Sequence, residues 1–186
     1  MRTLVLFVLT SGLYAQVAEF GVHGGASTLQ GKNIGQLSGA DLTLKDGFRL
    51  GGRITLNNWR FFGHEFGYAY NRTKLTLPGQ ELGTAIHQGF YNMLAYAMPE
   101  GSKVRPFLAG GGHFSNFVPP GSSASQGGGD NKFGFNYGGG IKAKVSPRFL
   151  IRFDVRQYVT GKPFDLPGAK GKIRQTEISA GFSLYM

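Results

Sequence analysis

Apolar and polar side chains alternate with a period of two in eight separate segments, and this pattern limits the fold of the chain more than any other feature. In residues 149–156, FLIRFDVR, apolar side chains at the odd positions alternate with Arg152, Asp154 and Arg156. Strict alternation places one set of side chains on each face of a β-strand. The predicted strands cover 17–27, 46–57, 60–73, 86–98, 104–117, 132–145, 149–160 and 173–186. No stretch of similar length has helical periodicity, so the sequence predicts an all-β fold.

The connections between these segments alternate between short and long. Short turns are expected at 58–59, 99–103 and 146–148, and long, polar, glycine-rich loops at about 28–45, 74–85, 118–131 and 161–172. An even number of strands brings both ends of the chain to the short-turn side. Short turns on one side and long loops on the other are the plan of an outer-membrane barrel. The prediction is an eight-stranded antiparallel up-and-down transmembrane β-barrel.

The N-terminus has the features of a secretory signal peptide. Arg2 supplies a positive charge, residues 3–13 are mostly apolar, and Ala15 is a small residue suited to cleavage. The apolar stretch is too short to cross a bilayer as a helix. We therefore expect a signal peptide at 1–15 and a single barrel domain at 16–186. The chain has no cysteine, which excludes a lipid anchor on cysteine, a disulfide and a thiolate metal site.

Alternation alone does not decide whether the apolar face points inward or outward. A soluble barrel and a membrane barrel produce the same pattern, with opposite faces inside. The secretory signal, the Phe and Tyr residues near predicted strand ends and the opposite charges at mid-strand all favour a membrane barrel. The formal net charge is +10. Because the basic residues alternate with apolar ones or lie in loops, we expect no nucleic-acid partner.

Two motifs resemble those of a known family. The strand Val104–Gly112, VRPFLAGGG, is similar to the Arg-Pro-aromatic strand of small bacterial outer-membrane barrels, and 179–186, SAGFSLYM, is similar to their C-terminal assembly signal. In that signal the relevant residues are Gly181, Leu184, Tyr185 and Met186, with Met186 at a position where Phe or Trp is usual. The chain thus resembles the eight-stranded barrels related to the OmpA transmembrane domain and to OmpX. The resemblance implies a monomer in the outer membrane of a Gram-negative cell, surrounded by lipid and lipopolysaccharide, assembled by the barrel-assembly machinery and without a cofactor.

Charged residues on the polar faces predict a network inside the barrel. Eight strands enclose a space that side chains just fill, and an isolated buried charge is very costly. We expect Glu65 and Glu177 to pair with Arg53, Arg152 and Arg156, with Asp154 nearby. The full predicted network is Arg49, Arg53, Glu65, Arg152, Asp154, Arg156 and Glu177. The favoured interpretation is a structural plug, and the alternative is a gate in a narrow pore.

A short motif, His113-Phe-Ser115-Asn, suggests a second alternative. It resembles the His-x-Ser-Asn motif of the lipid A 3-O-deacylases, in which His would be the general base for a Ser nucleophile. In that family the motif lies on the seventh strand, whereas here it follows the fifth-strand signature. The nearest downstream acid, Asp130, ends a glycine run. We expect no enzyme, and keep a hydrolase using His113 and Ser115 as the alternative.

The remaining motifs predict little chemistry. His23, His64 and His87 lie on three different strands without ligand spacing, so no metal site is expected. Glycine clusters such as 110–112 and 138–140 are expected to permit close packing in a narrow barrel. Lysines predicted at the outer rim could contact lipopolysaccharide phosphates: Lys32, Lys45, Lys74, Lys132, Lys162, Lys170 and Lys172. The expected role is structural or loop-mediated, in envelope integrity, adhesion or lipopolysaccharide contact.

Overall fold

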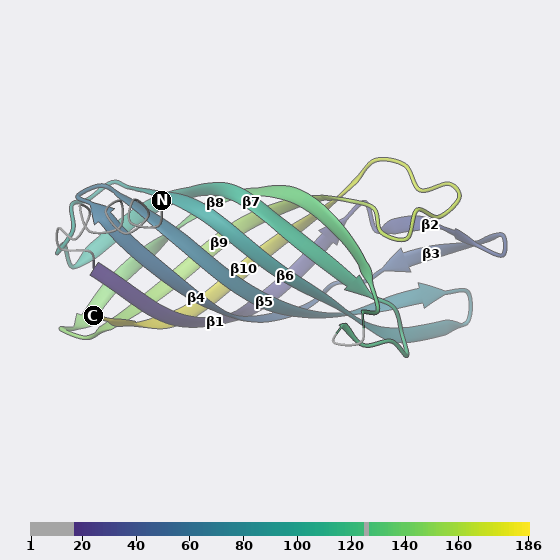
Figure 1. Ribbon diagram of the computed structural model, residues 1–186. Coiled ribbons are helices and arrows are strands. Elements are labelled where there is room, and N and C mark those ends of the chain that lie inside the picture. The colour runs from purple at the N-terminus through teal and green to yellow at the C-terminus, as the bar shows by residue number, and fades with distance from the viewer. Residues whose placement is uncertain (1–16, 125–126) are drawn as a thin grey trace, which may run out of the picture.

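The computed structural model describes residues 17–124 and 127–186, and the predicted signal peptide lies outside these residues. Within them the chain forms an elongated β-barrel with long hairpins and loops at one end (Figure 1). The strands are β1 (Val17–Gln30), β2 (Asn33–Leu37), β3 (Ala40–Leu44), β4 (Gly47–Trp59), β5 (Phe62–Leu77), β6 (Gln80–Tyr96), β7 (Val104–Val118), β8 (Asp130–Ser146), β9 (Phe149–Gly161) and β10 (Lys172–Tyr185). No helix in the described part of the chain has the length and apolar character needed to cross a bilayer.

Eight of these strands close the barrel, as the sequence predicted. β1 pairs with β4 and β10, β5 pairs with β4 and β6, and every pairing is antiparallel. The first and last strands meet at the short-turn end, where the backbone N–H of Met186 donates to the carbonyl of Ala18 at 2.9 Å. The closed ring leaves no barrel strand with an unpaired edge along its length.

Two of the predicted long loops are instead ordered hairpins. β5 and β6 continue beyond the barrel to a two-residue turn at Pro78-Gly79, with Leu77 paired with Gln80. The predicted loop at 28–45 contains the β2–β3 hairpin, whose turn places Ser38 and Gly39 at φ 52° and 79°. Both extensions carry apolar side chains that pack together, and this packing orders segments that polar composition had marked as loops. The β7–β8 and β9–β10 connections remain irregular, as predicted.

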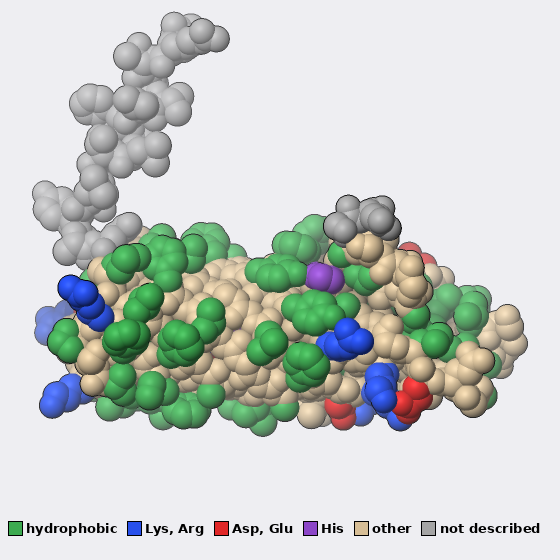
Figure 2. All heavy atoms as spheres, turned by 90° about the horizontal axis from the view of Figure 1, so that it is seen from below, with side chains coloured by type: hydrophobic (Ala, Val, Ile, Leu, Met, Phe, Trp, Pro, Cys, Tyr) green, Lys and Arg blue, Asp and Glu red, His purple; other side chains and the backbone are tan. Residues whose placement is uncertain are grey.

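The faces of the strands have polar side chains inside and apolar side chains outside. Arg49 and Arg152 are 0% and 1% exposed, whereas Phe153 on the same strand as Arg152 is 60% exposed. Figure 2 shows hydrophobic side chains along the barrel wall and Lys and Arg gathered toward the two ends. This polarity is opposite to that of a soluble barrel and matches a barrel that lies in lipid.

Inner glycines make room for large inner side chains. A Cβ atom on Gly140 would lie 2.8 Å from the Phe107 ring, and one on Gly67 would lie 2.2 Å from the Phe90 ring. These rings therefore pack over bare backbone in a narrow interior. Gly110 and Gly112 differ, because they face outward and a Cβ on either would meet no atom closer than 3.9 Å. Close packing accounts for the inner glycines and leaves these two outer ones unexplained.

Candidate functional site

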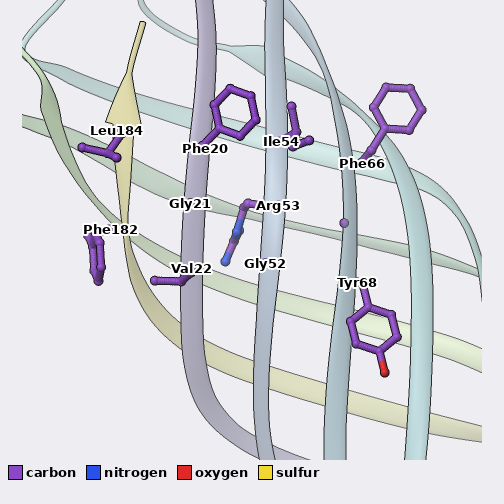
Figure 3. Close-up of a pocket in the computed structure, with 11 residues that line it drawn as sticks. Phe20, Gly21, Val22, Gly52, Arg53, Ile54, Phe66, Tyr68, Phe182 and Leu184 are labelled. Carbon is purple, nitrogen blue, oxygen red and sulfur yellow. The ribbon is translucent and has the colours of Figure 1, made fainter.

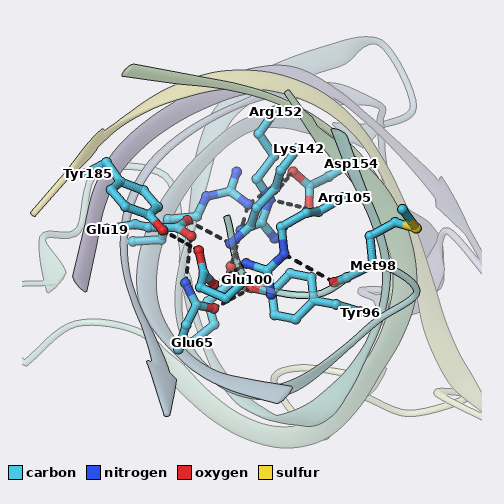
Figure 4. A network of polar contacts seen from close by, with 12 residues as sticks. Glu19, Glu65, Tyr96, Met98, Glu100, Arg105, Lys142, Arg152, Asp154 and Tyr185 are labelled. Atoms are coloured by element: carbon cyan, nitrogen blue, oxygen red, sulfur yellow. Dashed lines mark hydrogen bonds and ion pairs between the residues drawn. The ribbon is translucent and has the colours of Figure 1, made fainter. Parts of the chain in front are cut away.

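The centre of the barrel holds a cluster of three arginines and two acids from β4, β5 and β9. Asp154 lies between Arg53, at 3.1 Å, and Arg152, at 2.8 Å, and also pairs with Arg156 at 3.1 Å. Glu65 pairs with Arg152 at 2.6 Å and with Arg156 at 2.9 Å. Figure 4 shows Glu65, Arg152 and Asp154 of this cluster inside the barrel. The structure thus brings together Glu65, Asp154 and the three arginines expected beside them.

Glu177 lies in a different part of the interior from the one predicted. It pairs with Arg49 at 2.9 Å and lies 3.7 Å from the His23 imidazole, rather than joining Arg53, Arg152 and Arg156. The Arg49 guanidinium is 4.4 Å from the centre of the Tyr158 ring and donates to Gln88. Alternation specifies which face a side chain occupies. Its depth in the lumen depends on strand tilt and stagger, which the alternation does not specify.

A third group of polar contacts fills the lumen nearer the short-turn end. The Lys142 ammonium donates to Glu19 at 2.6 Å and to the Tyr96 hydroxyl at 2.7 Å. Asn57 donates to Glu19 and accepts from Tyr96, both at 2.8 Å. Glu19 and Lys142 are not part of the network predicted from the sequence, although strand alternation puts both on the inner face. The four residues form a closed ring of hydrogen bonds because they come from β1, β4, β6 and β8, which all face this level of the lumen.

The mouth at the short-turn end is covered by a contact that the sequence analysis missed. Arg105 pairs with Glu100 of the β6–β7 turn, and its guanidinium lies 3.6 Å from the centre of the Tyr96 ring. Tyr185 donates its hydroxyl hydrogen to the same carboxylate. The inward alternation of Arg105, Phe107 and Ala109 was the available signal for Arg105. Glu100 was not detectable in this way because it lies in a turn.

The long-loop end of the interior is closed by apolar side chains instead of charges. Ile34 of β2 and Leu44 of β3 are 0% and 2% exposed. The apolar cap, as we call this cluster, comprises Leu29, Ile34, Leu42, Leu44, Leu75, Ile86, Phe117 and Ile173, with Leu77, Phe164 and Leu166 packed against it. Between cap and charges lies a polar layer in which Gln88 donates to Ser115 at 2.8 Å and to Gln175 at 3.1 Å. Charged, polar and apolar side chains in contact with one another therefore occupy successive levels of the interior.

A closed eight-stranded barrel with a charged interior and an apolar wall is the architecture of a small outer-membrane protein. A family profile described as "Outer membrane protein beta-barrel domain" matches residues 3–185. The chain belongs to this family. It is therefore a protein of the bacterial outer membrane, with its short turns toward the periplasm and its long hairpins and loops toward the exterior.

Solved structures of other outer-membrane barrels have the same fold. OprG from Pseudomonas aeruginosa is 14% identical with a TM-score of 0.60, and the alignment covers 92% of this chain and 97% of OprG. Neisserial surface protein A is 13% identical with a TM-score of 0.62, covering 90% and 96%. Ail of Yersinia pestis, in complex with the heparin analogue sucrose octasulfate, is 14% identical with a TM-score of 0.50, covering 93% and 100%. A search of curated protein sequences gives no match. At these identities the likeness shows the fold alone.

The C-terminal residues of this outer-membrane barrel divide between the two faces of β10. Leu184 and Met186 point outward, 44% and 69% exposed, while Gly181 and Tyr185 are on the inner face. A Cβ on Gly181 would lie 2.9 Å from the Cβ of His23, so this position has no room for a side chain. Met186 continues the outward row of β10 at the position where family members usually have an aromatic residue.

His113 and Ser115 both point into the lumen of the barrel. His113 Nε2 lies 2.5 Å from Thr160 Oγ1, and the imidazole packs edge-on against the Tyr158 ring. Ser115 Oγ instead accepts a hydrogen bond from Gln88. Asp130, the acid considered from the sequence, accepts from the backbone N–H of Phe164. The two motif residues therefore have separate partners and are buried away from the lipid.

Two shallow hollows lie side by side on the lipid-facing wall of the barrel. The first, of about 710 Å³, has Gly52 on its floor and Phe20, Phe66 and Phe182 among its walls (Figure 3). The second, of about 520 Å³, has Gly112 on its floor and Tyr91 and Phe114 among its walls, and the Phe114 ring covers Gly89. Phe66 contributes to both. Outward glycines thus alternate with outward aromatic side chains around this part of the wall.

Charges at the extracellular end fall into paired and unpaired groups. Lys32 pairs with Asp46 at 3.0 Å, Lys74 pairs with Glu81 at 2.9 Å, and Lys45 also contacts Glu81. Lys132 pairs with Asp165 at 2.8 Å. Four of the seven rim lysines predicted to contact phosphates therefore already pair with acids, two of them with the shared carboxylate of Glu81. Among the described residues, no acid pairs with Arg72, Lys162, Lys170, Lys172 or Arg174.

The ion pairs of the rim lower the pKa values of their acids. Hydrogen bonds from Lys45 and Lys74 lower the pKa of Glu81 to about 2. At Asp46, slight burial alone would raise the pKa, but the backbone N–H of Leu29 and the Lys32 ammonium together hold it below its usual value. Both acids therefore stay ionised at neutral pH and hold the hairpins together. In the described residues, no group of three His, Asp or Glu side chains is arranged to hold a metal ion.

Proposed function

We propose that this outer-membrane barrel is a closed, non-conducting and non-enzymatic protein whose outer rim contacts lipopolysaccharide. One observation carries the proposal: the lumen is filled from the Glu100 mouth to the apolar cap, while cations without acid partners remain on the outside of the extracellular end. A filled lumen gives solute no path. Unpaired cations at the outer-leaflet surface attract lipid phosphates, at about 1 kcal/mol for each Lys or Arg.

The distribution of the unpaired cations supports lipopolysaccharide as the partner. Lys170, Lys172 and Arg174 are exposed and follow one another at the start of β10. Ail, a barrel of the same fold, has been crystallised with a polyanionic sulfated sugar. The anionic surface nearest to a barrel in the outer leaflet is the phosphorylated saccharide of lipopolysaccharide.

Lipopolysaccharide binding is tested with the mature barrel in detergent micelles. Replacing Lys170, Lys172 and Arg174 by Gln should weaken binding, and raising the salt concentration should remove most of the difference from wild type. The matched control replaces the acid-paired Lys32, Lys45 and Lys74 by Gln, which should change binding less. Equal binding by wild type and the Lys170/Lys172/Arg174 variant would contradict the proposal.

Conductance and hydrolysis test the other two parts of the proposal. In planar bilayers the wild-type barrel should show no stepwise ion current, and steady channel openings would favour the narrow pore. Incubated with lipid A, the barrel should release no acyl chain detectable by mass spectrometry. The hydrolase alternative would be established by acyl release that is abolished in both His113→Ala and Ser115→Ala.

A further inference from the structure

A polar hollow on the outer wall lies on the extracellular side of one of the lipid-facing hollows, with His87 and Asn116 between them. It has a volume of about 190 Å³ and lies between β5, β6 and the first residues of the β7–β8 loop. Arg72 and Tyr70 of β5 form one side, Gly83 and Ala85 of β6 form its floor, and Ser122 contributes from the loop. β5, β6 and the β7–β8 loop thus surround a small polar space on the outside of the barrel, separate from the lumen.

Arg72 is directed into this space. A Cβ built on Gly83 would lie 3.6 Å from Arg72 Nη2, so the guanidinium lies over the bare backbone of β6. Among the described residues, no acid pairs with Arg72 and no hydrogen bond uses the hydroxyl of Tyr70 or Ser122. The hollow therefore presents a full positive charge and two free hydroxyls. Such a set of groups suits a phosphate, which accepts charge-assisted hydrogen bonds.

The hollow lies at the depth of the outer-leaflet headgroups. Phe62 begins β5 at the periplasmic end, and Arg72 follows ten residues later on the same outward face. At about 3.3 Å per residue and a tilt of about 40°, this separation spans about 25 Å along the membrane normal. That distance is about the height of the apolar band of such barrels, so Arg72 is at its outer edge.

The register places an apolar groove below the charge. Across β5, β6 and β7 the outward rows read Arg72–Ala85–Val118, then Tyr70–His87–Asn116, then Tyr68–Gly89–Phe114, then Phe66–Tyr91–Gly112. The lower two rows contain the 520 Å³ hollow, with Gly112 on its floor. A Cβ on Gly89 would lie 2.2 Å from the Phe114 ring, so this ring covers Gly89 and forms one wall of the groove. A Cβ on Gly112 would meet no atom closer than 3.9 Å, so packing within the protein does not require a glycine there. The absence of a side chain at this position keeps the groove open.

We propose that this face binds one lipid A molecule of lipopolysaccharide, with a phosphate at Arg72, Tyr70 and Ser122 and an acyl chain in the groove over Gly112, between Tyr91 and Phe114. The inference rests on the proposed contact with lipopolysaccharide and assigns it a specific site. The positive charge of Arg72 and the free hydroxyls of Tyr70 and Ser122 favour a phosphate group. The apolar groove lies below Arg72, on the far side of the row Tyr70–His87–Asn116, and this order along the wall favours an amphiphile that lies along the membrane normal.

The test measures bisphosphorylated lipid A retained by the purified mature barrel, using native mass spectrometry in detergent at about 0.15 M salt, where diffuse attraction is screened within about 8 Å. Wild type should retain one lipid A. Arg72→Gln should reduce affinity about tenfold, as expected for loss of a charged hydrogen-bond donor. The reduction should disappear when dephosphorylated lipid A is the probe. Heat-dependent gel mobility verifies that each variant is folded.

Two matched controls are available in the chain. Gly112→Leu fills the groove and should weaken lipid A binding, whereas Gly110→Leu, on the same outward face of β7 but outside the groove, should not. Arg174→Gln removes an unpaired cation of the proposed rim contact and should reduce retention of lipid A at this salt concentration less than Arg72→Gln does. Equal effects of Gly110→Leu and Gly112→Leu would overturn the groove assignment.

Other outcomes separate this site from the general rim contact. If Arg72→Gln and Arg174→Gln weaken binding equally, the cations act only as a diffuse charge, and the specific site is wrong while the proposed function stands. If neither these variants nor the Lys170/Lys172/Arg174 variant changes binding, both proposals fail. Retention of phosphatidylglycerol with the same dependence on Arg72 would show that the occupant is a phospholipid and overturn the assignment to lipid A.

Discussion

The two halves of the barrel interior are closed by opposite chemistry. From the periplasmic mouth to Glu177 the lumen is filled by arginines, a lysine and acids in direct contact, whereas the extracellular end is filled by Leu, Ile and Phe side chains of the apolar cap. The charged half is enclosed by a continuous ring of strands. The cap combines residues of the β2–β3 and β5–β6 hairpins and the β9–β10 loop with the ends of the barrel strands β1, β7 and β10. Buried charges require matched partners at fixed positions, whereas apolar packing requires mainly adequate volume. The comparison indicates that the charged half tolerates substitution less than the cap.

The largest expected effect comes from removing one acid of the charged half. Glu65→Gln leaves Arg152 and Arg156 without one shared partner and should destabilise the barrel by about 3–5 kcal/mol. Unfolding in urea, followed by gel mobility and circular dichroism, measures this change. Glu81→Gln, which alters an exposed acid, is the control. A Glu65→Gln barrel as stable as wild type would contradict the inference that the charged half tolerates substitution less than the apolar cap.

A smaller and more local effect is expected from the cap. Ile34→Ala should cost about 2–4 kcal/mol, within the range for truncating a fully buried aliphatic side chain. Because β2 and β3 extend beyond the barrel, the loss should appear as faster hydrogen exchange in 33–44 with little change in the barrel strands. Leu37→Ala, at a position 48% exposed, provides the control. Simultaneous loss of protection in β9 and β10 would show that the two halves unfold together.

A still smaller effect is expected at the periplasmic mouth. Tyr185→Phe removes the hydroxyl that donates to Glu100 and should lower stability by about 0.5–1.5 kcal/mol. The β-sheet spectrum should not change, and the urea midpoint should fall slightly. A loss as large as that of Glu65→Gln would extend the sensitive charged region to the mouth itself.

The smallest effect concerns pH at the rim. Glu81 has an ordinary pKa of 4.5 and a folded pKa of about 2, lowered by Lys45 and Lys74. Its stabilising contribution is therefore present above pH 4.5 and is lost as the pH falls toward 2. Carboxyl NMR should show the Glu81 titration midpoint near 2, and Lys74→Gln should move it upward. A midpoint near 4.5 in wild type would mean that the pair does not form.

The irregular and ordered connections were not equally predictable. Composition correctly marked as loops the described residues between β7 and β8 and those between β9 and β10, but it also marked 74–85, where β5 and β6 form a regular hairpin. The glycine and polar residues of this segment predict the turn at Pro78-Gly79. They do not indicate which side chains pack against Leu75 and Leu77. Those partners come from the β2–β3 hairpin and from the β9–β10 loop, which are distant in sequence.

The sequence by itself determined the eight strands, the two faces of each strand, the alternation of turns and the presence of charges inside, because these follow from a side-chain period of two. The tertiary structure decided which inner side chains pair and how deep in the lumen each of them lies. It placed Glu177 with Arg49, joined Glu19 to Lys142 and directed Arg72 over Gly83. It also separated His113 from Ser115 by giving each another partner. The physical reason is that strand tilt and stagger set which inner side chains share a level, and local sequence encodes neither.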